Sequence, residues 1–142
     1  AQEREILDRM ATSRPVEFSR PVTTTRDLSL ARAAIDRIHI DPRVRDYIVD
    51  LVHATREPGK YKVELGGELI EFGASPRATI ALALASRAAA FLEGRAYVTP
   101  QDVKSVAMEV MRHRVIVSYE AEARDITSDA VVTRVLETLP VP

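Results

Sequence analysis

Three proline residues, each placed directly after a potential helix cap, constrain the fold of this chain most strongly. They stand in the dipeptides Asp41-Pro42, Ser75-Pro76 and Thr99-Pro100. Asp, Ser and Thr are favoured at the N-cap, and proline suits the first helical position, where its missing N–H would have no partner. Each dipeptide therefore predicts the start of a helix.

The residues that follow Pro42 and Pro100 repeat at helical spacing. Their apolar side chains recur three and four positions apart, as in amphipathic helices with one face toward a core. Asp102, three residues after Thr99, approximates a capping box and supports the second helix start. The two stripes are Val44, Tyr47, Ile48, Leu51 and Val52, and then Val103, Val106, Ala107, Val110 and Met111.

The block after Pro76 has a different pattern, because its apolar residues lie nearly all round the helix. Such a helix is usually buried on every side. We therefore predict a central helix that ends at Gly94, with Ile80, Leu84 and Phe91 in the core of a bundle.

The remaining segments predict shorter elements and set the fold class. Helical patterns cover 2–12, 30–38 and 128–139, whereas the aperiodic stretch 14–26 contains two prolines and is predicted to be a loop. Two short alternating runs joined by Gly66-Gly67 predict a β-hairpin at about 60–72. The predicted fold is mainly α: a single helical bundle domain over residues 1–142 with a short β-hairpin insertion.

The composition is that of an ordinary soluble globular protein, with 46% hydrophobic and 29% charged residues in 142. A net charge of −1 argues against partners such as nucleic acid or an anionic membrane. The longest apolar run, within 78–92, is interrupted by Ser86 and Arg87 and is not typical of a membrane span. Because the N-terminus does not resemble a signal peptide, we expect a cytoplasmic protein. Because the first residue is Ala1 and not Met, we expect this sequence to be a piece of a longer chain.

Motifs for catalysis are missing from the sequence. It contains neither a G-x-x-x-x-G-K-[ST] phosphate loop nor a G-x-G-x-x-G dinucleotide loop. The histidines, His39, His53 and His113, lack metal-ligand spacing, so no metal site is predicted. We expect this chain by itself to be catalytically inactive.

Arg77 is unusual, because it would be the second residue of its helix. A cation there opposes the helix dipole and costs about 0.3–1 kcal/mol if exposed. Arg77 could serve as a phosphate sensor beside the free first-turn N–H groups. Alternatively, it could pair with a carboxylate such as Glu71 or lie over apolar surface. The residues alone favour the second explanation, since one arginine is a weak signal.

A longer stretch around Arg77 resembles a known family. Residues 73–103, "GASPRATIALALASRAAAFLEGRAYVTPQDV", look like the C-terminal lid of MoxR-type AAA+ ATPases, and "GASPRA" resembles the sensor 2 motif of that family. The likeness extends to "EREILDRM" near the N-terminus, to 38–57 and to 110–142, and so covers essentially the whole chain. The stretch 57–72 departs from the family, because it is longer than the usual link to this motif. The role of the predicted hairpin is therefore open.

The resemblance implies a role in nucleotide sensing. In AAA+ proteins ATP lies between an α/β core with Walker motifs and a helical lid, and the sensor 2 arginine reaches from the lid to the γ-phosphate. Arg77 matches that arginine, with Ser75 and Pro76 forming the helix start. Because this sequence lacks the core, ATP and Mg²⁺ are expected in the parent protein and not tightly bound to this chain.

The resemblance also implies partners. These are the parent's own N-terminal AAA+ core, a homo-oligomeric ring that is commonly hexameric, and a von Willebrand factor A-domain protein, in a chaperone-like maturation role driven by ATP hydrolysis. The residues leave an alternative from another class: a stand-alone helical protein-interaction module without nucleotide function. A phosphate loop encoded upstream of Ala1 would favour the lid, and a start codon near Ala1 would favour the module.

Overall fold

The computed structural model describes residues 2–11, 20–65 and 67–142, which form two compact units, 1–30 and 31–142. The first unit contains helix α1 (Gln2–Met10) and the beginning of α2 (Thr25–Asp36). Helix α1 confirms the helix predicted over 2–12.

Helix α2 begins earlier than the predicted start at residue 30, because a local cap fixes its first turn. The N–H of Asp27 donates to Thr24 Oγ1 and the N–H of Thr24 donates to Asp27 Oδ2, both at 3.1 Å. This reciprocal cap starts the helix inside the segment predicted to be a loop. Residues 14–19 of that predicted loop lie outside the described residues.

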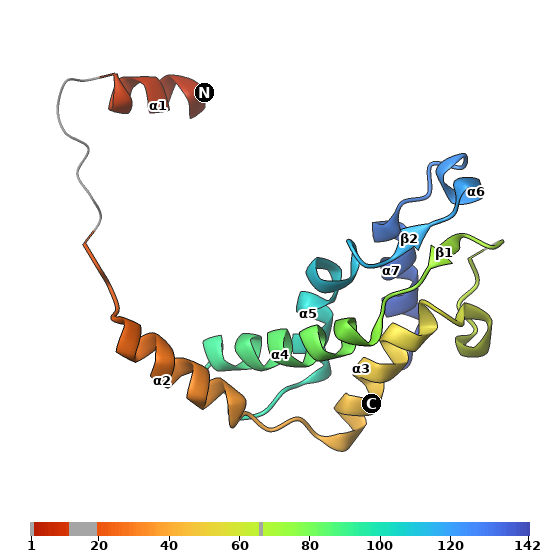
Figure 1. The fold of residues 1–142 in the computed structure, drawn as a ribbon, viewed down its shortest axis with the longest axis horizontal. Coiled ribbons are helices and arrows are strands. Elements are labelled where there is room, and N and C mark those ends of the chain that lie inside the picture. Colours follow the sequence, from red (N-terminus) through yellow and green to blue (C-terminus); the bar gives the residue numbers. More distant parts are fainter. Residues whose placement is uncertain (1, 12–19, 66) are drawn as a thin grey trace. The chain divides into compact units, whose positions relative to one another are not determined.

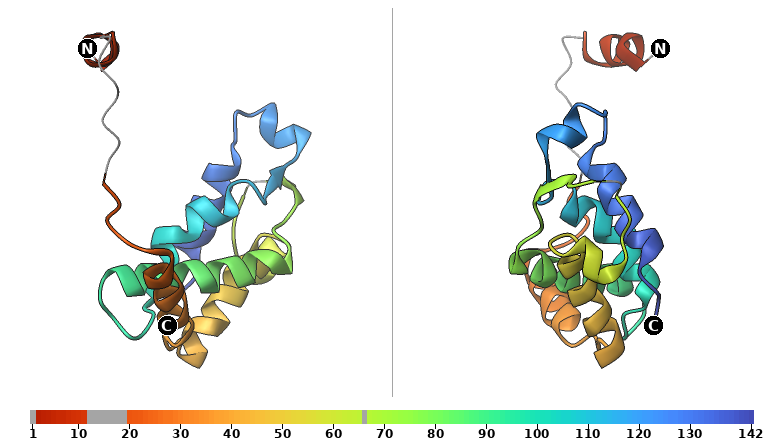
Figure 2. Two further views of the ribbon diagram at one scale, coloured as in Figure 1. Left: turned by 60° about the vertical axis from the view of Figure 1, so that its left-hand side comes forward. Right: turned by 90° about the vertical axis from the view of Figure 1, so that its right-hand side faces the viewer.

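The second unit is mainly helical, as predicted, and carries a small antiparallel sheet. The three helices that follow cap–proline dipeptides begin at the predicted prolines. Helices α4 and α5 pack most extensively, while α3 and α7 complete the bundle around them (Figures 1 and 2). The elements are α3 (Pro42–Ala54), the 3₁₀ helix η1 (Pro58–Tyr61), β1 (Ile70–Phe72), α4 (Pro76–Leu92), α5 (Pro100–Met111), β2 (Ile116–Val117), α6 (Tyr119–Glu122) and α7 (Ser128–Thr138).

The core of this unit lies between α3, α4, α5 and α7. Each helix contributes one apolar stripe, as the spacing predicted for α3, α5 and α7. The largest fully buried apolar side chains are Ile48, Leu51, Val52, Leu69, Leu82, Val103, Met111, Val131, Val132 and Val135.

The prediction that α4 is buried on every side is wrong. Ile80 is 62% exposed and Leu84 49% exposed, and Phe91 is only half-buried. Neighbouring helices α3 and α5 cover one face. The buried face of α4 consists of Ala78, Leu82, Ser86 and Ala90, spaced four residues apart.

The small sheet is present, but its strands differ from the predicted hairpin. Strand β1 pairs with β2, so Ile70 lies opposite Val117 and Phe72 opposite Ile116. The first predicted arm turns through η1 instead, and Val63 is buried against the core without joining the sheet. Val63 is therefore buried in the core in place of pairing with β1 as the predicted hairpin required.

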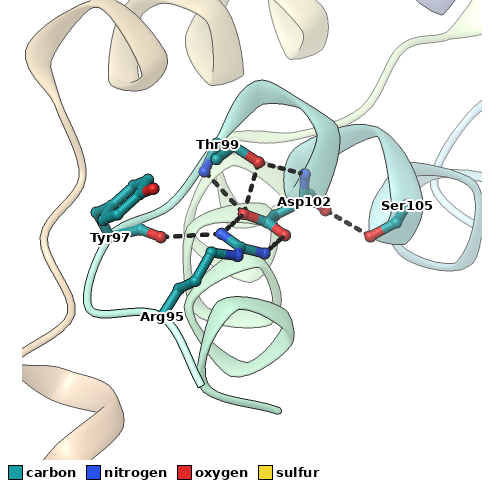
Figure 3. Close-up of polar contacts among 5 residues, drawn as sticks. All are labelled: Arg95, Tyr97, Thr99, Asp102 and Ser105. Carbon is teal, nitrogen blue, oxygen red and sulfur yellow. Dashed lines mark hydrogen bonds and ion pairs between the residues drawn. The ribbon is translucent and has the colours of Figure 1, made fainter. Parts of the chain in front are cut away.

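A polar cluster fixes the connection between α4 and α5 (Figure 3). Gly94, with φ of 68°, ends α4, and the Arg95 guanidinium then reaches the Asp102 carboxylate, with one N–O distance of 2.7 Å. Asp102 also accepts from the N–H of Thr99 at 2.7 Å, which confirms the predicted capping box. Hydrogen bonds from Arg95, supported by Thr99, lower the pKa of Asp102 to about 2.

The segment before α3 is tied to this same connection. The N–H of His39 donates to Ala96 O at 3.0 Å, and the N–H of Val98 donates to His39 O at 2.9 Å. From α4, Arg87 Nε donates to Ile38 O at 3.1 Å. These bonds hold the entry to α3 against the exit of α4.

Truncation of α4 should distinguish its two faces. We expect Leu82→Ala, at a fully buried position, to lower the free energy of unfolding by about 2–5 kcal/mol. We expect Ile80→Ala to change it by about 0.5 kcal/mol or less, because that side chain is largely in water. Urea unfolding of the isolated chain measures both, and equal losses would contradict the one-sided burial of α4.

Loss of Asp102 should destabilise the chain in a pH-dependent way. Its pKa is lowered in the folded state, so its stabilisation is complete above about pH 4 and is lost as the pH falls toward 2. We expect Asp102→Asn to lower the free energy of unfolding by about 2 kcal/mol at pH 7 and to flatten its decline between pH 4 and 2. Unfolding series at several pH values test this, and parallel curves for variant and wild type would refute it.

Candidate functional site

The start of α4 is the candidate site, and its cap differs from those of the other helices. Ser75 occupies the N-cap position in an extended conformation, and Pro76 is the first helical residue. The Ser75 side chain, however, accepts no hydrogen bond from the first turn, so the expectation that it caps the helix is wrong. The N–H of Ala78 bonds to the Ser75 carbonyl instead, at 2.8 Å, which removes the donor that a side-chain cap would use.

Every other α-helix whose N-cap is described has a side-chain cap. The cap residues are Thr24 for α2, Asp41 for α3, Thr99 for α5, Ser118 for α6 and Thr127 for α7. Each accepts a hydrogen bond from a first-turn N–H. Among the helices that can be compared, α4 is therefore the one that begins without a side-chain cap, and the N–H of Arg77 is the donor left in its first three residues.

Arg77 lies in the first turn of α4 and is exposed. Within the described part of the chain its guanidinium makes neither a hydrogen bond nor an ion pair, so the predicted alternative of a pair with Glu71 is not realised. The other alternative, contact with apolar surface, stays open, because Ile80 and Leu84 follow on the same face at helical spacing. Among the residues that the structure describes, no carboxylate thus offsets the unfavourable position of Arg77 in the dipole.

The face of α4 that carries Arg77 is apolar beyond its first turn. Ile80 and Leu84 are exposed, and Phe91 lies half-buried on the same side. An unpaired cation at an uncapped helix end, followed by an apolar stripe, can receive an anionic group presented by an apolar surface.

A buried hydrogen bond joins the residues before α4 to the end of α3. The N–H of Ala74 donates to the hydroxyl of Thr55 at 2.9 Å, in a fully buried contact. The sequence contained no signal for this residue, because a threonine at a helix C-terminus is usually unremarkable. Ser75, Pro76 and Arg77 are consecutive in the sequence, whereas Thr55 joins them only through the fold.

Other parts of the described chain offer weaker candidates. Two hollows have volumes of about 400 and 430 Å³, one lined by residues of 55–73 and the other by the end of α4 and the start of α5. Arg77 lines neither. The residues that the structure describes contain no cluster of His, Cys, Asp or Glu suited to a metal ion. None of the described helices has the length and apolar character needed to cross a membrane.

Comparison with known proteins identifies the family of the chain. The family described as AAA lid domain matches residues 65–135, which include Arg77 and helices α4 and α5. The chain is 36% identical to Chaperone MoxR1 of Mycobacterium tuberculosis over 141 residues, 99% of this chain and 37% of that protein. It is 39% identical to Protein MoxR of Paracoccus denitrificans over 118 residues, 80% of this chain and 35% of that protein.

A solved structure shares the fold. A crystal structure from Cytophaga hutchinsonii, of a protein provisionally assigned as an ATPase, superposes with a TM-score of 0.90 at 33% sequence identity and covers 99% of this chain. This chain spans 42% of that protein, and 35 to 41% of the curated relatives that it matches. The family match, the relatives and the shared fold lead to one conclusion: the chain belongs to the AAA lid domain family and is the lid of a MoxR-type AAA+ ATPase.

Proposed function

We propose that this lid supplies the sensor 2 arginine of its parent ATPase, with Arg77 binding the γ-phosphate of ATP. The observation that carries the proposal is the state of the α4 start, where Arg77 has no partner among the described residues and Ser75 provides no side-chain cap. A phosphate placed there would neutralise Arg77 and accept from the first-turn N–H of that residue. Pro76 contributes no donor, but it presets the backbone of the turn.

This arrangement would make the position of the lid depend on whether ATP or the diphosphate is bound. An ATP γ-phosphate would remove the cost of about 0.3–1 kcal/mol that an unpaired cation carries at a helix N-terminus. The diphosphate lacks that group, so the two nucleotides bind a closed lid with different free energies. Such a difference is what shifts a lid between positions during ATP hydrolysis.

The apolar stripe of α4 supports docking against the parent's own N-terminal AAA+ core. Ile80 is 62% exposed and Leu84 49% exposed on the face that carries Arg77, so a covering surface would remove apolar area from water. The core would supply the Mg²⁺ site, the Walker residues and the attacking water. The family resemblance supports the rest of the proposal. The parent would assemble into rings, commonly hexameric, bind a von Willebrand factor A-domain protein, and act in the cytoplasm in a chaperone-like role.

Removal of the guanidinium tests the sensor role. In the full-length parent, Arg77→Ala should lower the ATP turnover number by about tenfold or more, because it removes a charged donor from the transferring phosphate. In the isolated lid the same change should leave the thermal midpoint unchanged or slightly higher, since an unfavourable charge is lost. Arg134→Ala, an exposed arginine on α7, is the matched control and should leave turnover unchanged. Wild-type turnover in Arg77→Ala would refute the sensor role.

The isolated chain should bind Mg-ATP only weakly and should not hydrolyse it. One exposed ion pair contributes about 0–1 kcal/mol, whereas association has to offset several kcal/mol of lost translational and rotational freedom. Isothermal calorimetry and a phosphate-release assay on the purified chain measure both properties. Low-micromolar binding, or turnover that follows the chain through purification, would show a complete site in this chain alone.

A further inference from the structure

A buried threonine joins the end of α3 to the segment that leads into α4. Thr55 has no exposed surface, and it is one of three polar side chains buried in the described part of the chain. Its hydroxyl donates to Val52 O at 2.7 Å and accepts from the N–H of Ala74 at 2.9 Å. The hydroxyl thus uses both its donor and its acceptor capacity, and it connects α3 to Ala74, nineteen residues after Thr55.

Close backbone contact beside this hydrogen bond limits movement of the same segment. A Cβ added to Gly73 would lie 2.4 Å from Thr55 O and 2.6 Å from Arg56 Cγ. The φ of Gly73 is not in the left-handed region, so close approach, not backbone conformation, requires glycine here. Gly73 and Ala74 are therefore seated directly against the last turn of α3.

Only Ser75 and Pro76 separate this tether from Arg77. Ser75 makes no side-chain cap, so the start of α4 is not fixed by its own N-cap as in the neighbouring helices. Proline has a nearly fixed φ, which makes the short link stiff. The fully buried Ala78 then seats the first turn on the bundle. The position of Arg77 thus depends on the tether on one side and on Ala78 on the other.

We propose that Thr55 is a positioning residue for Arg77, holding the start of α4 at the place and angle from which the guanidinium meets the nucleotide phosphate. This inference rests on the proposed sensor role of Arg77. It also makes α3 part of the nucleotide response, because a shift of α4 would be transmitted to α3 through the Thr55 hydroxyl. A displacement of about 1 Å can lower the rate of an enzyme by about a hundredfold, so a tether of this kind is significant for turnover.

The test compares Thr55→Val with Thr55→Ser in the full-length parent, well below the thermal midpoint of each variant. Valine keeps the shape but leaves the buried N–H of Ala74 without its acceptor, whereas serine keeps the hydroxyl. We expect turnover of Thr55→Val to fall by about tenfold and Thr55→Ser to stay near wild type. Thr133→Val, an exposed threonine on α7, is the matched control and should have no effect.

A double-mutant cycle separates positioning from general structural damage. If Thr55 acts through Arg77, Thr55→Val should reduce turnover no further in the Arg77→Ala background. In the isolated chain, Thr55→Val should also speed amide hydrogen exchange at Ala74, with the core amides of α5 unchanged. Should Thr55→Val prove unfolded by circular dichroism, Thr55→Ala takes its place in the same cycle.

The outcomes distinguish this inference from the proposed function. Wild-type turnover in Arg77→Ala would refute the sensor role itself, whatever Thr55 does. A clear loss in Arg77→Ala with wild-type turnover in Thr55→Val would overturn the positioning role alone. The same would follow if the two losses multiplied in the double variant, because Thr55 would then act independently of Arg77.

Discussion

Packing of the buried face of α4 is the constraint on which the rest of the structure depends. Ala78, Leu82, Ser86 and Ala90 are buried against α3 and α5, and this choice of face turns the opposite side outward. Arg77, Ile80 and Leu84 lie on that outward side. Burial of this face gains many weak dispersion contacts with the neighbouring helices. The same packing therefore builds the core and presents the candidate site.

The two ends of α4 are held by different means, and the difference corresponds to their roles. At the C-terminal end, Gly94 stops the helix and the pair of Arg95 and Asp102 locks the turn into α5 with short charged hydrogen bonds. At the N-terminal end the helix lacks a side-chain cap, and the tether of Ala74 to Thr55 holds it from outside. The C-terminal end stabilises the fold, whereas the N-terminal end leaves the N–H and the guanidinium of Arg77 without a partner among the described residues.

An available helix start has a cost in stability. A side-chain cap contributes about 0.5–2 kcal/mol, and α4 does without one while also carrying, among the described residues, an unpaired cation in its first turn. Local features that lower stability without structural compensation tend to mark functional sites. The proposed sensor role accounts for this feature, because the missing partner of Arg77 would be a phosphate from another part of the parent protein.

The features that the sequence predicts are those set by interactions between near neighbours in the chain. The helix starts at Pro42, Pro76 and Pro100 were predictable, because caps and prolines act on neighbours within a few residues. The position of Arg77 in its helix followed from the same rule. The sensor role proposed for Arg77 rests on family resemblance, since helical spacing places a side chain but gives it no ligand.

Only the tertiary structure decided which face of α4 is buried, that β1 pairs with β2, and that Thr55 holds the start of α4. Apolar residues lie nearly all round α4, so its sequence is compatible with burial of any face, and packing against α3 and α5 determines which face is buried. The Thr55 hydroxyl and Ala74 are nineteen residues apart in the sequence. Contacts over such distances depend on how whole helices pack, and no pattern within a single segment encodes them.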